Sequence, residues 1–273
     1  MISPAANGRV VLGAPVALFG GVYSNHLSLR ATLDDAGAAG AAAVICLGDL
    51  GAFGPHPDRT CRIVREAGIP VVQGNYDHSL GHDLADCQCG YTDPRDNHFA
   101  ALSYRYTYAS TSPGHRGWLR TLPPSLRFHV GDRRVLACHA SPRRINEFLW
   151  ESTCPDHFLL RLLDRAGADV LCVSHTGIPW LRRLPERRAV VNVGAIGRPA
   201  NDGLTSVPYA LLRIDEHGNP RVEWRRVEYD IERLAAEMRG ERLPEEFVET
   251  ILTGWWTTCL EVLPAKERSR GKY

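Results

Sequence analysis

The sequence lacks the features that mark membrane, secreted or strongly charged proteins. It has no run of about 18 apolar residues, the length that a membrane-spanning helix needs, and residues 1–9 lack the apolar centre of a secretion signal. Its 32 Lys and Arg almost balance its 31 Asp and Glu, so no overall field attracts nucleic acids or membrane surfaces. We therefore expect a cytoplasmic protein that has neither a nucleic-acid polymer nor a membrane as its partner.

The sequence also lacks the cysteine pattern of a disulfide framework. Three of its eight cysteines lie in or beside apolar runs and are expected to be small buried residues: Cys46, Cys138 and Cys172. Cys87 and Cys89 differ, because their segment is rich in Gly, Asp and His. This pair has three interpretations: free thiols in a surface loop, a local bridge, or a zinc or catalytic site that includes His78 and His82.

Strand-like and helical patterns alternate along the chain, without an internal repeat or a low-complexity linker. Its 273 residues fit one domain, which we expect over residues 1–230, with a helical extension over 231–273 packed on it. This order predicts a sheet with helices on its faces. The predicted strands are 10–20, 41–47, 69–73, 126–130, 134–138, 170–174, 190–193, 209–214 and 222–227. The predicted helices are 27–39, 57–67, 99–107, 113–122, 158–166, 231–239 and 245–252.

Four strand ends carry side chains that bind metal ions. Asp49 follows one apolar run within a glycine-rich turn, Asn75 follows the next, and His139 and His175 end two later runs. The carboxyl ends of parallel strands meet at one edge of a sheet, where α/β proteins keep their chemistry. One carboxylate, one amide and two imidazoles suit a divalent cation. The sequence therefore predicts a metal site at this edge.

A long segment without clear periodicity, at about residues 78–98, interrupts the pattern directly after Asn75. Such insertions beside a strand end are more often functional than accidental, so we expect this one to cover the site. Its later polar residues are candidates for facing a substrate: Asp93, Arg95, Asp96, Asn97 and His98.

The order of these motifs resembles the calcineurin-like metallophosphoesterase family, and in particular its YfcE-type and diadenosine-tetraphosphatase-related branch. The matching segments cover nearly the whole chain: Gly48-Asp49, Gly74-Asn75 with Asp77, Cys138-His139-Ala140, Ser174-His175-Thr176 and the stretch from Asn192 to Pro199. The resemblance implies a four-layer α/β/β/α sandwich of mixed sheets. It also implies a metal held by Asp49, Asn75, His139 and His175.

The sequence departs from the family pattern at one of the two metals of that family. Where the family has an Asp-x-His pair, this chain has Gly21 and Tyr23, and Gly177 replaces the second histidine of Gly-His-x-His. Tyr76 replaces a histidine that the family uses near the leaving group. We therefore expect one Mn, Fe or Zn ion. The alternative is a second ion at a site rebuilt from Tyr23, His26, His78, Cys87 or Cys89.

The residues around the expected metal receive roles by position. The candidate catalytic residues are Asp77, Tyr23, Tyr76 and His78, and the candidate substrate-binding residues are Asn25, Arg143, Arg198, Cys87 and Cys89. A guanidinium group suits the recognition of an oxyanion. Trp255 and Trp256 are expected to cover an apolar groove or to form the contact of a homo-oligomer.

Together these features predict a metal-dependent phosphoester hydrolase. Its expected partner is a small phosphorylated molecule: a phosphomonoester, a phosphodiester or a nucleotide. The alternative is the same fold used for ligand binding, sensing or metal chemistry away from phosphorus, which the lost ligands favour.

Overall fold

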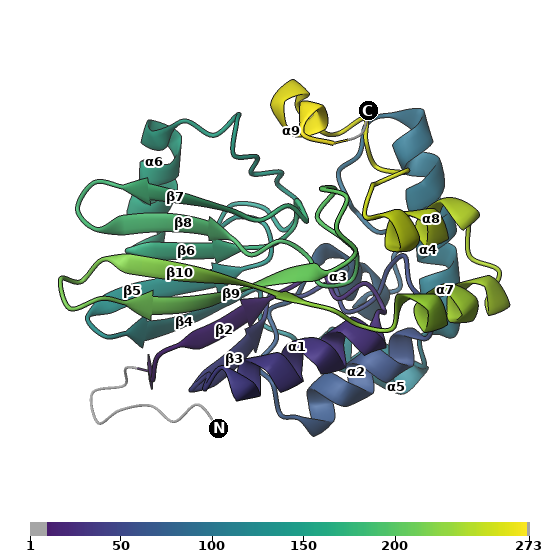
Figure 1. Ribbon diagram of the computed structural model, residues 1–273, viewed down its shortest axis with the longest axis horizontal. Helices are drawn as coiled ribbons and strands as arrows, with labels where there is room; N and C mark the ends of the chain where they lie inside the picture. Colours follow the sequence, from purple (N-terminus) through teal and green to yellow (C-terminus); the bar gives the residue numbers. More distant parts are fainter. Residues whose placement is uncertain (1–9, 272–273) are drawn as a thin grey trace.

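The computed structural model of the protein describes residues 10–271. The residues for which we expect no secretion signal, 1–9, lie outside this range. Within it the strands form two mixed sheets (Figure 1). The six-stranded sheet has the order β1 (Val11–Leu12), β4 (Ser125–Val130), β5 (Arg133–Cys138), β6 (Val170–Val173), β8 (Arg188–Asn192), β7 (Trp180–Leu184). The four-stranded sheet has the order β10 (Pro220–Val227), β9 (Val207–Ile214), β2 (Val16–Phe19), β3 (Ala43–Cys46).

The helices lie on both outer sides of the paired sheets (Figure 1). Their bounds are α1 (His26–Ala38), α2 (Pro57–Glu66), α3 (Asn75–Gly81), α4 (Pro94–Ser110), α5 (Pro113–Leu119), α6 (Asp156–Ala166), α7 (Ile231–Gly240), α8 (Glu245–Thr253) and α9 (Ala265–Ser269). None of the helices in the described range is long and apolar enough to cross a membrane.

Alternation along the strands produces the layers. In β2, Val16 and Leu18 face the six-stranded sheet, whereas Ala17 and Phe19 face the side that carries α1, α2 and α4. Successive side chains of a strand point to opposite faces, so one apolar strand supplies two cores. The outer face of β5 and β6 packs against α6. The four-layer α/β/β/α sandwich of mixed sheets is therefore confirmed.

The predicted elements differ from the observed ones in a few places. The predicted strand 10–20 is two strands in different sheets, because the chain turns around Pro15 between β1 and β2. The predicted strand 69–73 is a single bridge between Cys46 and Val71, beside Pro70, which has no N–H to donate. Helices α3 and α4 enter both ends of the predicted insertion, and β7 and α9 were not predicted.

The C-terminal helices share the core of the main body. Leu234 and Met238 of α7, with Phe247 and Ile251 of α8, belong to the same apolar cluster as Phe19 of β2. Figure 1 shows α7, α8 and α4 gathered at the end of the sheets to which the carboxyl ends of β3 and β6 point. The division into residues 1–230 and 231–273 itself stays a prediction.

Candidate metal centre

The backbone after β3 is shaped to present Asp49. Gly48 and Asp49 both adopt positive φ, 86° and 57°, which is uncommon for a non-glycine residue and recurs at functional sites. A Cβ atom on Gly74 would collide with the Asp49 carboxylate. Gly74 thus lets the start of α3 approach the carboxylate closely, and the Tyr76 N–H donates to Asp49 Oδ1 at 3.0 Å.

Asp49, His139 and His175 converge on one point between the two sheets. Each offers one ligand atom, and these atoms lie within 4.8 Å of one another. His139 Nε2 lies 3.2 Å from Asp49 Oδ2 and 3.2 Å from His175 Nδ1. Asp49 is 3% and His139 1% exposed, whereas His175 is partly exposed. The structure thus brings together three of the four residues that the sequence predicts as ligands.

The hydrogen bond on the far side of His139 favours a cation at this point. His139 Nδ1 lies 2.7 Å from the Leu47 carbonyl, which can only accept, so Nδ1 carries a proton. In a neutral imidazole, Nε2 then directs a lone pair at a carboxylate and at a second imidazole. Without an added proton or a metal ion, an N–H donated by His175 Nδ1 can satisfy this lone pair, but the Asp49 carboxylate still faces it. A backbone carbonyl behind a ligating histidine is also the usual support of a metal site.

Asn75 supplies the fourth predicted ligand from the first residue of α3. Its Nδ2 donates to the Cys87 carbonyl at 2.8 Å, and its Oδ1 is buried without a partner among the described residues. His175 Nε2 is likewise buried and unpartnered. Buried polar atoms are nearly always hydrogen-bonded, so the orphaned Asn75 Oδ1, on the residue before the Tyr76 N–H that binds Asp49, fits a coordinated ion. The residues present therefore suit a divalent metal.

Electrostatics shift the pKa values of the two histidines in opposite directions when no metal is bound. Burial, followed by the neighbouring His139, lowers the pKa of His175 to about 3, so His175 is neutral and able to ligate. For His139, burial acts to lower the pKa, but the Asp49 carboxylate outweighs it and the pKa is raised. The raised pKa has the same cause as the expected metal affinity, which is the attraction of a cation by Asp49.

Asp77 lies beneath the centre and holds its backbone. Its Oδ2 accepts from the N–H groups of Asp49 and Gly74 at 2.8 and 2.9 Å, and its Oδ1 accepts from Leu50 at 3.0 Å. Asp77 is fully buried, and burial followed by the charge of Asp49 raises its pKa to about 6. Its contacts are those of a positioning residue, whereas the sequence suggested a catalytic one.

Comparison with known proteins agrees with this geometry. Residues 18–217 match the model of the calcineurin-like phosphoesterase superfamily domain. The chain belongs to this superfamily. An uncharacterised protein of Methanocaldococcus jannaschii is 24% identical over 256 residues, covering 88% of this chain and 98% of that protein.

Two solved structures allow this member of the superfamily to be compared in three dimensions. A metallophosphoesterase from Sphaerobacter thermophilus has a TM-score of 0.65 and 26% identity, over 88% of this chain and 99% of that one. A hypothetical protein from Pyrococcus horikoshii has a TM-score of 0.72 and 21% identity, over 89% and 99% of the two chains. These proteins share the fold along almost their full length.

Rings fill the positions at which this chain departs from the family motif. A Cβ atom on Gly21 would lie 2.9 Å from Cζ and 3.1 Å from the hydroxyl of Tyr23. A Cβ atom on Gly177 would lie 3.5 Å from the ring of Trp256, and Ala195 borders both glycines. Tyr23 is 4% exposed, and burial raises its pKa far above the ordinary value, so it stays a neutral phenol. Tyr23 is thus not a phenolate ligand in the metal-free protein.

Arg198 adds a buried positive charge to this neighbouring position. It is 6% exposed, and its Nε has no partner among residues 10–271. The guanidinium carbon lies 3.6 Å from the ring centroid of Trp256, 4.9 Å from Phe53 and 5.7 Å from Tyr23. The turn before it is tied to the other glycine-rich turn by hydrogen bonds from Ile196 to Gly20 and from Gly197 to Gly21. Aromatic faces thus stabilise this cation in place of a carboxylate.

Other residues of the predicted site have structural partners instead. Asn25 caps α1 through Ser28 and donates to the Gly197 carbonyl at 3.2 Å. The Tyr76 hydroxyl donates to Ser103 at 2.9 Å, so it points to α4. Arg143 forms an ion pair with Glu147.

The histidines proposed for an alternative site are also engaged elsewhere. His78 contacts Gln73 and stacks on His82 at 4.3 Å, while His26 binds Glu237 at 2.7 Å. Within the described range, the group of three or more side chains that could hold a metal is the one formed by Asp49, His139 and His175.

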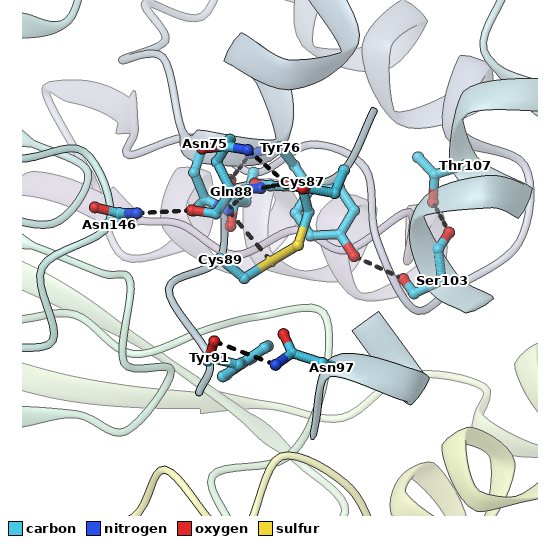
Figure 2. Close-up of a disulfide and its surroundings, with 12 residues drawn as sticks. Asn75, Tyr76, Cys87, Gln88, Cys89, Tyr91, Asn97, Ser103, Thr107 and Asn146 are labelled. Carbon is cyan, nitrogen blue, oxygen red and sulfur yellow. Dashed lines mark hydrogen bonds between the residues drawn. A yellow bond between two sulfur atoms is a disulfide. The ribbon is translucent and has the colours of Figure 1, made fainter. Parts of the chain in front are cut away.

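The cysteine pair is a local bridge, shown in Figure 2. Cys87 and Cys89 are 4% and 7% exposed, so the interpretation as free thiols in a surface loop is wrong, because the side chains pack into the core. Bridged sulfurs are not thiolate ligands, which also contradicts the zinc site with His78 and His82 for this oxidised form. The predicted buried free cysteines Cys46, Cys138 and Cys172 are confirmed.

The polar residues at the end of the insertion mostly anchor the C-terminal segment. Asp93 caps α4, and Arg95 donates to the Thr257 carbonyl at 2.7 Å. Asp96 accepts from the Val262 N–H at 3.0 Å, and the Asn97 amide donates to the Tyr91 carbonyl at 3.3 Å. His98 packs against the neighbouring Phe99 ring. These contacts explain how a segment far along the chain brings Trp256 to Arg198.

Sequence reasoning missed two residues that complete the centre. Phe148 packs on His175 with ring centroids 4.6 Å apart, and Asn146 donates to the Gln88 carbonyl at 2.9 Å. Both come from the loop after β5, more than 50 residues from the Cys87–Cys89 segment. An aromatic residue or an asparagine in a loop carries no pattern in the sequence that would indicate this contact.

Proposed function

We propose that this protein is a metal-dependent phosphoester hydrolase that uses one divalent transition-metal ion. The single observation that carries the proposal is the convergence of Asp49, His139 and His175. Asn75, whose Oδ1 is buried and unpartnered, directly precedes the Tyr76 N–H that binds Asp49. Membership of the superfamily supports the chemistry, because phosphoester hydrolysis is what the family name describes. Mn, Fe and Zn all fit this mixed oxygen and nitrogen ligand set.

The chain's own residues act at two neighbouring positions, the metal centre and the position of Arg198. A bound ion would polarise a phosphoryl oxygen. It would also lower the pKa of a bound water molecule toward neutral pH. Asp49, Asn75, His139 and His175 hold it, and Asp77 fixes the turn that carries Asp49. Arg198 provides a fixed positive charge next to this centre, which suits the charge of a phosphoryl group.

The Tyr23 hydroxyl lies at the glycine that replaces a family ligand. There it donates a hydrogen bond to the substrate or to a water molecule. Asn25, Arg143, Tyr76 and His78, which the structure engages elsewhere, stay predictions of lesser weight. The substrate is a small phosphorylated molecule, and the cytoplasmic location and a homo-oligomer stay predictions.

A second candidate function is ligand binding or sensing without turnover. Its supporting observation is the filling of the neighbouring position by Tyr23 and Trp256, which leaves no room for the symmetric two-metal clamp. In that case the metal and Arg198 would hold an anion but not cleave it.

Metal content and turnover separate these functions. Protein purified without oxygen should contain one ion per chain, measured by elemental analysis. With Mn, Fe or Zn it should hydrolyse members of a panel of phosphomonoesters, phosphodiesters and dinucleotides. His139→Ala and His175→Ala should lose both metal and turnover, whereas His217→Ala, in the exposed β9–β10 turn, should keep both. Metal without turnover on the whole panel would favour binding, and unchanged metal in both variants would contradict the centre.

A further inference from the structure

The Cys87–Cys89 loop lies directly against one of the proposed metal ligands. The Asn75 amide donates to the Cys87 carbonyl at 2.8 Å and to the Cys89 sulfur at 3.5 Å. Figure 2 shows the two cysteines and the bridge beside Asn75, with Asn146 approaching the loop from another segment. Asn75 itself is 1% exposed. The loop therefore covers the side of the centre at which Asn75 stands.

A second segment closes on the same loop. Asn146 donates to the Gln88 carbonyl at 2.9 Å, and the Tyr91 ring stacks on Phe148 at 5.8 Å. Phe148 in turn packs on His175 at 4.6 Å. The loop and this segment thus form one cover over Asn75 and His175. In this closed form the loop and this segment shield Asp49 and Asn75, which are 3% and 1% exposed, whereas His175 is the most exposed of the four expected ligands.

The outer side of the cover faces an open hollow. Its volume is about 400 Å³, and its lining includes both cysteines, Gln88, Tyr91, Asn97 and Asn146. The loop therefore separates a solvent-filled space from the metal centre. The hollow borders both cysteine residues, so a small thiol reaches the bridge from this space once local motion uncovers the sulfurs, whose residues are 4% and 7% exposed. Opening of the loop would connect the hollow with the centre.

The bridge has little value as a general stabiliser of the fold. It joins residues only two positions apart, and a disulfide restricts the unfolded chain less as the loop that it closes becomes shorter. The other six cysteines of the described range are buried and unpaired, so the protein is not built on disulfides. A bridge of this kind points to a local role. In cytosolic proteins, the class to which we expect this protein to belong, disulfides are typically catalytic or redox-responsive.

We propose that the Cys87–Cys89 pair is a thiol–disulfide modification site that controls access to the metal centre. This proposal rests on the proposed function for the identity of the centre. A thiolate of a dithiol reductant attacks one bridge sulfur, breaks the S–S bond and forms a mixed disulfide. This attack releases one cysteine as a thiolate, and the second thiol of the reductant then attacks the mixed disulfide and releases the other cysteine. The reductant thereby loses two electrons and becomes the cyclic disulfide.

The backbone of the loop explains why reduction opens it. Gln88 stands between the cysteines at φ 51°, a left-handed conformation that non-glycine residues rarely adopt. The bridge joins the residues on both sides of Gln88 and, together with the hydrogen bond from the Gln88 N–H to Asp86 Oδ1 at 2.8 Å, restrains Gln88 in this conformation. Without it Gln88 can return to ordinary backbone angles. That movement displaces the Cys87 and Gln88 carbonyls from Asn75 and Asn146, which removes the contacts of the cover.

The experiment compares oxidised and reduced forms of the metal-loaded protein, with reductant removed and thiols counted before each measurement. The first readout is the rate at which a chelator removes Mn from the protein. The second is hydrogen exchange of residues 75–91, and the third is kcat/KM for a chromogenic phosphodiester. If the open form is a minority of about 10% in the oxidised protein, reduction should raise the chelation rate and kcat/KM about tenfold. Reoxidation should reverse both.

Two matched variants test whether the Cys87–Cys89 bridge itself causes the response to reductant. Cys87→Ser with Cys89→Ser should behave as the reduced protein and should not respond to reductant, whereas Cys154→Ala, which removes an unpaired cysteine, should respond as the natural protein does. Faster chelation and exchange without any phosphoester turnover would support the gate and contradict the proposed function. Equal chelation, exchange and kcat/KM in both redox forms would overturn the gate. Substrate would then enter elsewhere, as through the groove of about 280 Å³ that borders His139 and Arg144.

Discussion

Two neighbouring positions at the carboxyl ends of the strands have opposite chemistry. At the first, Asp49, His139 and His175 direct electron-rich atoms at one point, and the acceptor of Asn75 is unpartnered. At the second, Tyr23, Trp256 and Ala195 fill the space beside Gly21 and Gly177, and Arg198 supplies a positive charge. The first position attracts a cation, whereas the second already contains one.

The difference shows how aromatic packing can occupy one position while its neighbour keeps side chains that suit a metal ion. Removal of ligands alone would leave a polar cavity that takes up water. Here other side chains pack where the family's ligands would stand, and the positive charge is supplied by the side chain of Arg198. The guanidinium group needs no ligands of its own, because aromatic faces surround it. The two halves of the site can therefore be tested separately, by variants that act on one position but not on the other.

The largest effect is expected for Asp49→Asn. This change removes the charge that attracts a cation and should lower metal affinity more than the 10–100-fold that is typical of outer partners of a metal site. Turnover should fall with it, while the fold is kept, because the amide retains the size of the carboxylate. Elemental analysis after dialysis measures the effect. Full occupancy in this variant would show that the ion lies elsewhere.

Asp77→Asn should act on the same position through the backbone. The new NH₂ group would face N–H donors, so at least one of the bonds to Asp49, Leu50 and Gly74 is lost. A buried unsatisfied group costs about 1–3 kcal/mol, and we expect the free energy of unfolding to fall by about 2 kcal/mol. Urea unfolding and a metal titration measure the two consequences. Normal stability with lost turnover would instead assign Asp77 to catalysis.

Arg198→Met should separate function from stability at the second position. Methionine has a similar length and suits the aromatic rings, and replacement of a buried charge by an apolar side chain is often neutral or stabilising. Turnover should fall about 100-fold if the guanidinium stabilises charge in the transition state. Metal content should not change. Arg144→Met, at an exposed arginine, is the control, and equal turnover in both variants would contradict the role of Arg198.

Tyr23→Phe should have the smallest effect. The ring keeps filling the space beside Gly21, so unfolding free energy should change by no more than about 1 kcal/mol, the value of an ordinary hydrogen bond. Turnover should fall more than stability if the hydroxyl positions the substrate. Steady-state kinetics and thermal unfolding measure the two. A variant that binds a second ion about 3.5–4 Å from the first would contradict the assignment of one metal.

Part of this comparison could be predicted from the sequence. The strands that end at Asp49, His139 and His175 were recognisable, because apolar runs followed by Gly-Asp or Ser-His are local patterns. The loss of ligands at Gly21 and Gly177 was also visible. What occupies their space was not, since Trp256 reaches Gly177 from 79 positions further along the chain, after α8. The contacts of Asp77 could not be predicted, because its three partners are backbone groups, which leave no trace in side-chain identity.

The sequence by itself determined the family, the layered fold and the ligand types, because strand alternation and strand-end motifs are short-range properties of the chain. Only the tertiary structure decided the direction of each side chain. It turned Tyr76 to Ser103, paired Arg143 with Glu147 and placed Arg198 among rings from three separate segments. These outcomes depend on which distant groups meet in the packed core. Burial without a partner, as at Asn75 Oδ1, is a property of that packing and of no single residue.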